Sequence, residues 1–208
     1  RPYSNSLAEV IEHLLPDIDK SRLPLLNLRE INRKAYIVVC ADRGLAGAFN
    51  TNLLKIAQKE IDDFGKGNVD IFCVGKKARD YFTYRSYNII ESHVDFWAEM
   101  EFENAMMIGR SAIDHFTNGL VDEVHVVYNY FLNVAQQEVK SETLLPLNYD
   151  TNKITTTDRL YEPSKEELVN TLIPRHLNVQ MWKYLLESYA SEQAARMLSM
   201  ENATSNAQ

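Results

Sequence analysis

The sequence predicts an α/β fold, a Rossmann-like layered sheet domain flanked by an antiparallel pair of N- and C-terminal helices. The middle of the chain alternates short apolar runs with amphipathic stretches of helical period, which is typical of strands covered by helices. The first residues carry apolar side chains at helical spacing. Residues 166–208 contain no glycine and a single proline, which favours a long helix.

The N-terminal segment predicts a short amphipathic helix. Leu7, Val10, Ile11 and Leu14 share one face, and Pro16 ends the pattern. Because so short a helix is marginal alone in water, we expect its apolar face to pack against another element.

The middle predicts five strands and three helices. The helix over 51–64 would begin at a cap, Asn50 or Thr51, and end at Gly65, and the last helix would close at Gly119. The final two strands are close in sequence, which predicts an antiparallel pair. The predicted strands are 35–41, 69–74, 87–90, 123–132 and 137–145, and the predicted helices are 51–64, 76–82 and 105–116.

The C-terminal quarter predicts a short helix and then a long one, with Pro174 in the first turn of the second, where its missing N–H costs nothing. A narrow stripe on this helix would form a seam with the N-terminal helix. The chain then divides into a helix end (1–16), an α/β body (17–163) and a helical part (164–208). The stripe consists of Trp182, Leu186, Tyr189, Gln193, Met197, Met200 and Thr204.

Composition excludes several classes of function. The net charge is −7 and the basic residues are dispersed, so nucleic acid is not an expected partner. No window is apolar enough for a membrane span, so we expect no direct membrane insertion. Cys40 and Cys73 lie in apolar strand-like runs, where free cysteines behave as small buried hydrophobes.

The glycine-containing loop at 41–50 follows a strand and precedes a helix, a position that can bind phosphate. Gly44 and Gly47 do not make the dinucleotide pattern, and no Gly-Lys-Ser/Thr triplet follows. A tight turn with Asn50 as helix cap is the favoured interpretation. A nucleotide-binding α/β enzyme stays open as the alternative.

No catalytic, metal or cofactor site is predicted. The histidines are scattered without acidic or cysteine companions at metal-ligand spacing. No Gly-x-Ser-x-Gly elbow occurs, and neighbouring carboxylates point to different parts of a helix surface. The histidines are His13, His93, His115, His125 and His176.

The C-terminal run 191–207 is rich in small side chains. Ala190, Ala194, Ala195 and Ala203 permit close approach of another backbone, and we hypothesise that they also leave a low-friction outer surface.

Two segments resemble the gamma-subunit family of rotary ATP synthases. Residues 41–50, Ala-Asp-Arg-Gly-Leu-Ala-Gly-Ala-Phe-Asn, resemble its signature Ser-Asp-Arg-Gly-Leu-Cys-Gly-Gly-Phe-Asn. Residues 191–207 resemble its signature Ser-Glu-x-Ala-Ala-Arg-Met-x-Ala-Met-x-x-Ala-Thr-x-Asn-Ala. Segments at 1–3, 74–80, 161–164 and 172–175 are similar to further family segments. The departures are Ala41, Ala46, Ala48 and Ser199; Ala48 implies that this position does not need a positive φ.

The resemblance implies a non-catalytic central-stalk subunit without cofactors. Its partners would be the alpha and beta subunits, the epsilon subunit and the c-ring, on the cytoplasmic face of a bacterial inner membrane rather than in an organelle. Family members extend beyond both ends of this sequence, so we expect these residues to fold without supporting torque alone. Stand-alone adaptor function is the second alternative.

The resemblance also implies where partners would touch the chain. Residues near the mouth of the hexamer and residues of the body are both candidates. The candidate contacts are Glu192, Gln193, Arg196, Met197 and Met200 in the tail and Asp42, Arg43, Lys76 and Lys77 in the body.

Overall fold

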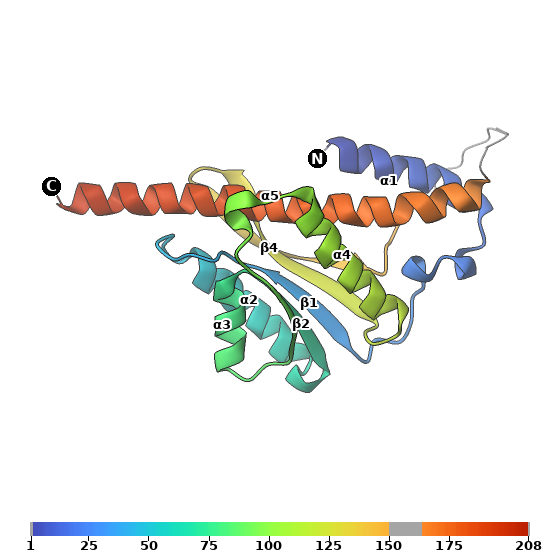
Figure 1. Cartoon of the computed structure of the whole chain (residues 1–208), viewed down its shortest axis with the longest axis horizontal. Helices are drawn as coiled ribbons and strands as arrows, with labels where there is room; N and C mark the ends of the chain where they lie inside the picture. The colour runs from blue at the N-terminus through green and yellow to red at the C-terminus, as the bar shows by residue number, and fades with distance from the viewer. Residues whose placement is uncertain (1, 150–163, 208) are drawn as a thin grey trace.

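The computed structural model describes residues 2–149 and 164–207. At its centre lies a five-stranded sheet in the order β3-β2-β1-β4-β5. The strands are β1 (Lys34–Val39), β2 (Val69–Val74), β3 (Ile89–His93), β4 (Glu123–Asn133) and β5 (Gln136–Leu145). The helices are α1 (Pro2–Leu14), α2 (Phe49–Phe64), α3 (Lys76–Tyr84), α4 (Phe102–Thr117) and α5 (Lys165–Ala207) (Figure 1).

The predicted α/β architecture is confirmed. The first four strands run parallel, and β5 returns antiparallel to β4, as the short spacing predicted. Helices α2 and α3 cover one face, whereas α4 crosses to β4 on the other. The strand order therefore reverses between β1 and β4. In doubly wound sheets, the carboxyl ends of two such strands border the crevice in which ligands bind.

Each face of the sheet buries an apolar core. Leu53, Ala57 and Ile61 of α2 pack with Phe82 of α3 on one side. On the other side α4 and α5 bury Ile108, Phe116, Leu177 and Met181. Fully burying such side chains contributes about 2 kcal/mol each, so these cores hold the helices on the sheet.

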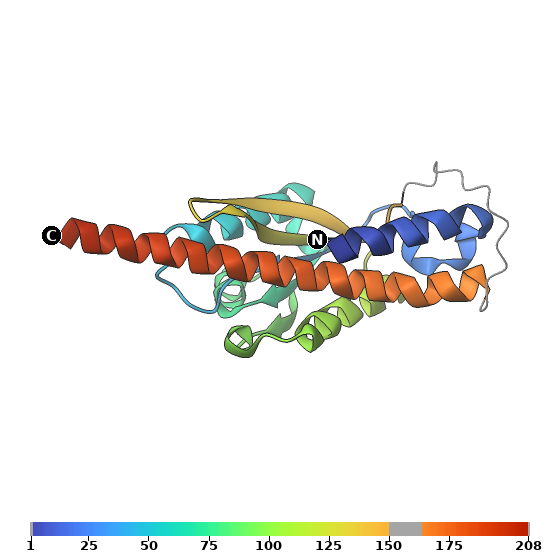
Figure 2. The same ribbon diagram turned by 90° about the horizontal axis from the view of Figure 1, so that it is seen from above.

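Helix α1 packs antiparallel to the first half of α5, as predicted. Leu7, Ile11 and Leu14 are buried, and the two helices lie side by side in both views (Figures 1 and 2). The C-terminal part of α5 extends beyond the body. One helix thus has a long part that is packed on the body, as far as Ser199, and a short projecting end.

The division of the C-terminal region at Pro174 is wrong. Residues 165–207 form one continuous helix with Pro174 inside it. Val169, Ile173 and Leu177 continue a single buried face across the proline. Their packing outweighs the backbone hydrogen bond that proline removes.

The expected helix cap at Asn50 is also wrong. Helix α2 begins earlier, at Phe49 after Ala48, and no side chain caps it. The Asn50 amide instead closes the preceding loop, because Nδ2 donates to the Arg43 carbonyl over 3.2 Å and Oδ1 accepts from the Ala41 amide over 3.3 Å. Ala48 has a φ of −82°, which confirms that this position needs no positive φ.

The third strand begins two residues later than the predicted Tyr87, at Ile89. The Tyr87 amide donates to the Phe82 carbonyl, and its ring meets the Phe82 ring edge to face. Tyr87 therefore belongs to the turn after α3. Gly119 closes α4 with a φ of +72°, as predicted. The predicted boundary at 163 and the similar segment at 161–163 lie outside the described residues.

Candidate functional site

A cleft of about 550 Å³ lies between α5 and the carboxyl edge of the sheet. It brings together residues that the sequence predicted in two separate segments. From the body come Asp42, Arg43 and Lys76, and from α5 come Glu192, Gln193 and Arg196.

Asp42 connects the ends of three strands. Its Oδ1 accepts from the Lys76 backbone amide over 2.7 Å, at the start of α3 after β2. Its Oδ2 accepts from the Asp95 amide over 2.8 Å, in the loop after β3. The Lys76 ammonium in turn forms an ion pair with Asp95. Both Asp42 oxygens are therefore engaged within the chain.

Glu192 and Arg196 form a half-buried ion pair one turn apart on α5. Glu192 is only 4% exposed, and burial raises its pKa, while the Arg196 charge partly offsets that rise. Arg196 Nη2 also donates to the Gly44 carbonyl over 3.4 Å. The pair thus joins α5 to the glycine-containing loop.

Two aromatic side chains of the cleft were not predicted as one site. Trp97 and Tyr189 stack with ring centroids 6.4 Å apart and planes 7° apart. The Trp97 Nε1 atom is buried and has no hydrogen-bond partner among the described residues. Tyr189 belonged to the predicted stripe, but only the fold brings Trp97, from the loop before α4, beneath it.

The remaining predicted contact residues lie outside the cleft. Met197 and Met200 are about half exposed, at 51% and 52%, on the projecting part of α5. Lys77 is exposed, and its side chain passes near Gly44. Arg43 and Gln193 are exposed at the rim of the cleft.

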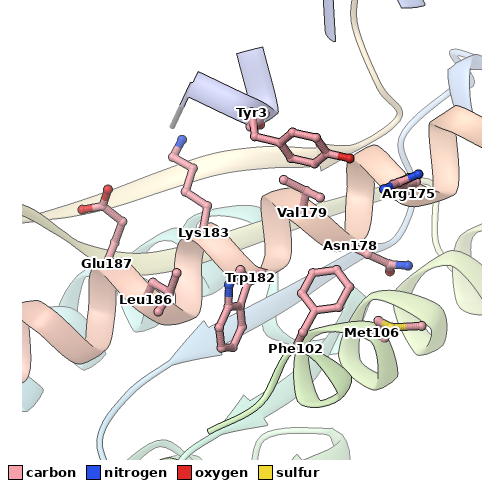
Figure 3. Close-up of a pocket in the computed structure, with 11 residues that line it drawn as sticks. Tyr3, Phe102, Met106, Arg175, Asn178, Val179, Trp182, Lys183, Leu186 and Glu187 are labelled. Atoms are coloured by element: carbon pink, nitrogen blue, oxygen red, sulfur yellow. The ribbon is translucent and has the colours of Figure 1, made fainter. Parts of the chain in front are cut away.

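A second, mainly apolar groove of about 580 Å³ lies where α1, α4 and α5 meet (Figure 3). Trp182 and Leu186 of the predicted stripe face it, together with Tyr3 of α1 and Phe102 of α4. The stripe therefore meets α1 only at this end, and another face of α5 contacts the sheet.

The crevice between the ends of β1 and β4 is occupied by α5 itself. Ala195 packs on a small apolar cluster of Ala41, Ala46 and Phe49. A Cβ at Gly47 would lie 3.2 Å from the Ser199 hydroxyl, so the loop and the helix are close together. Ala194 is 7% exposed. Both alanines allow α5 to approach the body closely. The hypothesis that the alanines form a low-friction outer surface is therefore wrong for Ala194 and Ala195.

The site offers little for catalysis. Within the described ranges, no three His, Cys, Asp or Glu side chains gather as metal ligands. Both cysteines are buried and unpaired. Helix α5 lies in the crevice between the ends of β1 and β4. The fold and the site define an α/β body across which one long helix is held.

Comparisons with known proteins agree with this class. The family model described as ATP synthase matches residues 1–208. The ATP synthase gamma chains of Chloroherpeton thalassium and Chlorobium phaeobacteroides are 40% and 42% identical to this chain, covering all of it and 74% of each relative. The chain belongs to the ATP synthase gamma chain family.

Solved structures share the fold. The central stalk of the Tetrahymena thermophila mitochondrial ATP synthase superposes with a TM-score of 0.72 at 22% identity, over 97% of this chain and 94% of that one. The rotor of the Euglena gracilis enzyme gives 0.63 at 22% identity, over 91% and 71%. The fold is therefore that of central-stalk chains in these synthases.

Proposed function

We propose that this chain couples rotation of a membrane c-ring to conformational changes in an alpha/beta hexamer, and is not itself a catalyst. Family membership supports this role. The structural observation that carries it is the division of α5 into a long part that is packed on the body and a short projecting end, at whose start Met197 and Met200 are exposed. A projecting helix can enter a ring of partner subunits while the body stays outside it.

The exposed residues are the proposed contacts with partners. Arg43, Gln193, Met197 and Met200 are free to meet the hexamer near its mouth, and Lys77 lies exposed beside the same loop. Asp42, Lys76, Glu192 and Arg196 are used within the chain, so we propose that they shape the contact surface.

The catalytic residues in this proposal belong to the beta subunits, and no cofactor is required. The epsilon subunit and the c-ring would bind the body. No helix in the described part of the chain has the length and apolarity to cross a membrane. We therefore propose peripheral attachment through the c-ring, on the cytoplasmic face of a bacterial inner membrane, in keeping with the bacterial relatives.

Titration calorimetry with purified partners tests the proposal. We expect saturable binding of this chain to the epsilon subunit, and binding to the alpha/beta hexamer that weakens when Met197 and Met200 are both changed to Glu. The matched control changes the exposed Tyr84, the last residue of α3, to Glu. Absence of binding to either partner would contradict the proposed role, and saturable binding of ATP or NAD would favour the nucleotide-binding alternative.

A further inference from the structure

Strand β4 continues past the end of its neighbour β1. The last residues paired between these strands are Val38 and Val127. Beyond them, Asn129 and Phe131 of β4 still pair with β5 on one side, but no strand of the described residues lies on the other. The buried backbone groups of Asn129 on that side need hydrogen-bond partners from another element, and α5 lies there.

Three polar side chains of α5 supply these partners. The Asn129 amide donates to the Ser188 hydroxyl over 3.3 Å, and the Ser191 hydroxyl donates to the Asn129 carbonyl over 3.3 Å. The Phe131 amide donates to Glu187 Oε2 over 3.0 Å. We call Glu187, Ser188 and Ser191 the polar clamp.

The polar clamp is buried. Glu187, Ser188 and Ser191 are 9%, 3% and 0% exposed, and Asn129 is 3% exposed. Water therefore cannot readily replace the two hydrogen bonds of Asn129, whereas the bond between Phe131 and Glu187 is partly buried. Moving α5 along or around its axis would leave buried backbone groups of β4 without partners, which is more costly than losing an exposed bond.

Contacts farther along α5 continue the same attachment. Arg196 reaches the Gly44 carbonyl, and Ala195 packs against Phe49. Apolar packing resists large displacements of the helix, but the attraction itself is not directional. Hydrogen bonds require defined distances and angles, so the polar clamp is the part of the interface that sets the register of the helix.

We propose that the polar clamp fixes the rotational and axial position of α5 on the body and is the point through which torque passes between the body and the projecting helix. This inference rests on the proposed function. It assigns Glu187, Ser188 and Ser191 as positioning residues, since their action is exerted through α5.

The test replaces Glu187, Ser188 and Ser191 with alanine together in an assembled synthase. Alanine is the strongest helix former, so the change removes the hydrogen bonds without weakening the helix. The matched control replaces the exposed Glu201 and Ser205 of the same helix with alanine. The rate of amide exchange at Asn129 and Phe131 measures directly whether the polar clamp is formed. The number of protons pumped per ATP hydrolysed measures coupling.

We expect the triple variant to exchange these two amides about tenfold faster, because each lost hydrogen bond shifts the docked population several-fold. We also expect it to pump fewer protons per ATP while hydrolysis continues, and the control to match the unsubstituted complex. Faster exchange with unchanged pumping would overturn the torque role, and unchanged exchange would overturn the clamp itself.

Failure of the proposed function has a different signature. In that case the unsubstituted chain would bind neither the epsilon subunit nor the alpha/beta hexamer, and the torque role would be overturned with it. The triple variant would still exchange its amides faster than the control, because the clamp depends only on contacts within the chain. The single variant Ser188→Ala removes one hydrogen bond, so its amide exchange rate at Asn129 should lie between those of the unsubstituted chain and the triple variant.

Discussion

The Ser188 hydroxyl lies 3.3 Å from the Asn129 backbone nitrogen, on the side of β4 where β1 has already ended. A helix side chain here takes the place of a neighbouring strand. This relationship explains why α5 crosses the crevice of the sheet instead of packing on one face alone, and why polar residues occur on its buried face.

Removing the charge of Arg196 should destabilise the chain. Arg196→Ala leaves the Glu192 carboxylate buried without its partner, which should lower the free energy of unfolding by about 3 kcal/mol. Urea unfolding measures the loss. Arg79→Ala breaks a more exposed pair with Asp80 and should cost less than about 1 kcal/mol.

Replacing both Glu192 and Arg196 provides the second control. Glu192→Leu with Arg196→Met removes the charges together and should recover most of the lost stability. If this double variant is as unstable as Arg196→Ala, packing rather than an unpaired charge explains the loss.

Gly75→Ala should be severely destabilising. Gly75 has a φ of +97°, and an added Cβ would lie 2.0 Å from the Cys40 carbonyl oxygen. Because that oxygen belongs to the backbone, the loop after β1 would have to move, at a cost above about 3 kcal/mol. Thermal unfolding measures it, and Gly67→Ala is the control, since a Cβ there meets no atom within 4 Å. Equal effects of the two changes would contradict the close approach.

Both cysteines should resist thiol reagents in the native state. Cys40 and Cys73 are about 1% and 0% exposed. Burial raises the pKa of Cys73 to about 12 and raises that of Cys40 as well, so almost no thiolate is present at pH 8. Ellman's reagent should react only after unfolding, whereas Leu45→Cys, at an 82% exposed position, should react at once. Rapid native reaction of the unsubstituted chain would contradict this burial.

His176 should make the chain less stable in acid. Burial lowers the pKa of His176 to about 4, below its ordinary value of 6.5. Between these values the unfolded chain binds more protons than the folded one, so stability falls as the pH drops from about 6.5 to 4, by at most about 3 kcal/mol. Urea unfolding across this range should show a smaller decline for His176→Gln. The control His13→Gln, at an exposed position, should follow the parent chain.

Much of the fold could be predicted because its signals are local. The apolar run at Val69–Val74 became β2 with those same bounds. The spacing of Leu7, Val10, Ile11 and Leu14 identified the buried face of α1 except at Val10, which is 47% exposed. Local signals wrongly predicted a break in the helix at Pro174. Proline weakens a helix by removing one backbone hydrogen bond, but here packing that only the assembled fold provides outweighs that loss.

The site was predicted only in part. The resemblance selected Asp42 and Glu192 from distant segments, but their meeting in one cleft depends on the path of α5. Nothing in the sequence singled out Ser188, and Ser191 stood out only as the first residue of the tail signature. Neither was predicted to be buried, since small polar residues on a helix ordinarily face solvent. The two serines are buried because β1 stops before β4 does, so that α5 takes the place beside the end of β4.

Pro174 also determines where α5 can bend. Proline removes one backbone hydrogen bond from the helix, so flexion concentrates at that point. Its neighbour Arg175 lies over the Tyr3 ring of α1, and Glu187 lies between this point and the projecting end. The point at which α5 lacks a backbone hydrogen bond is therefore separated from its projecting end by the residues that attach the helix to the body.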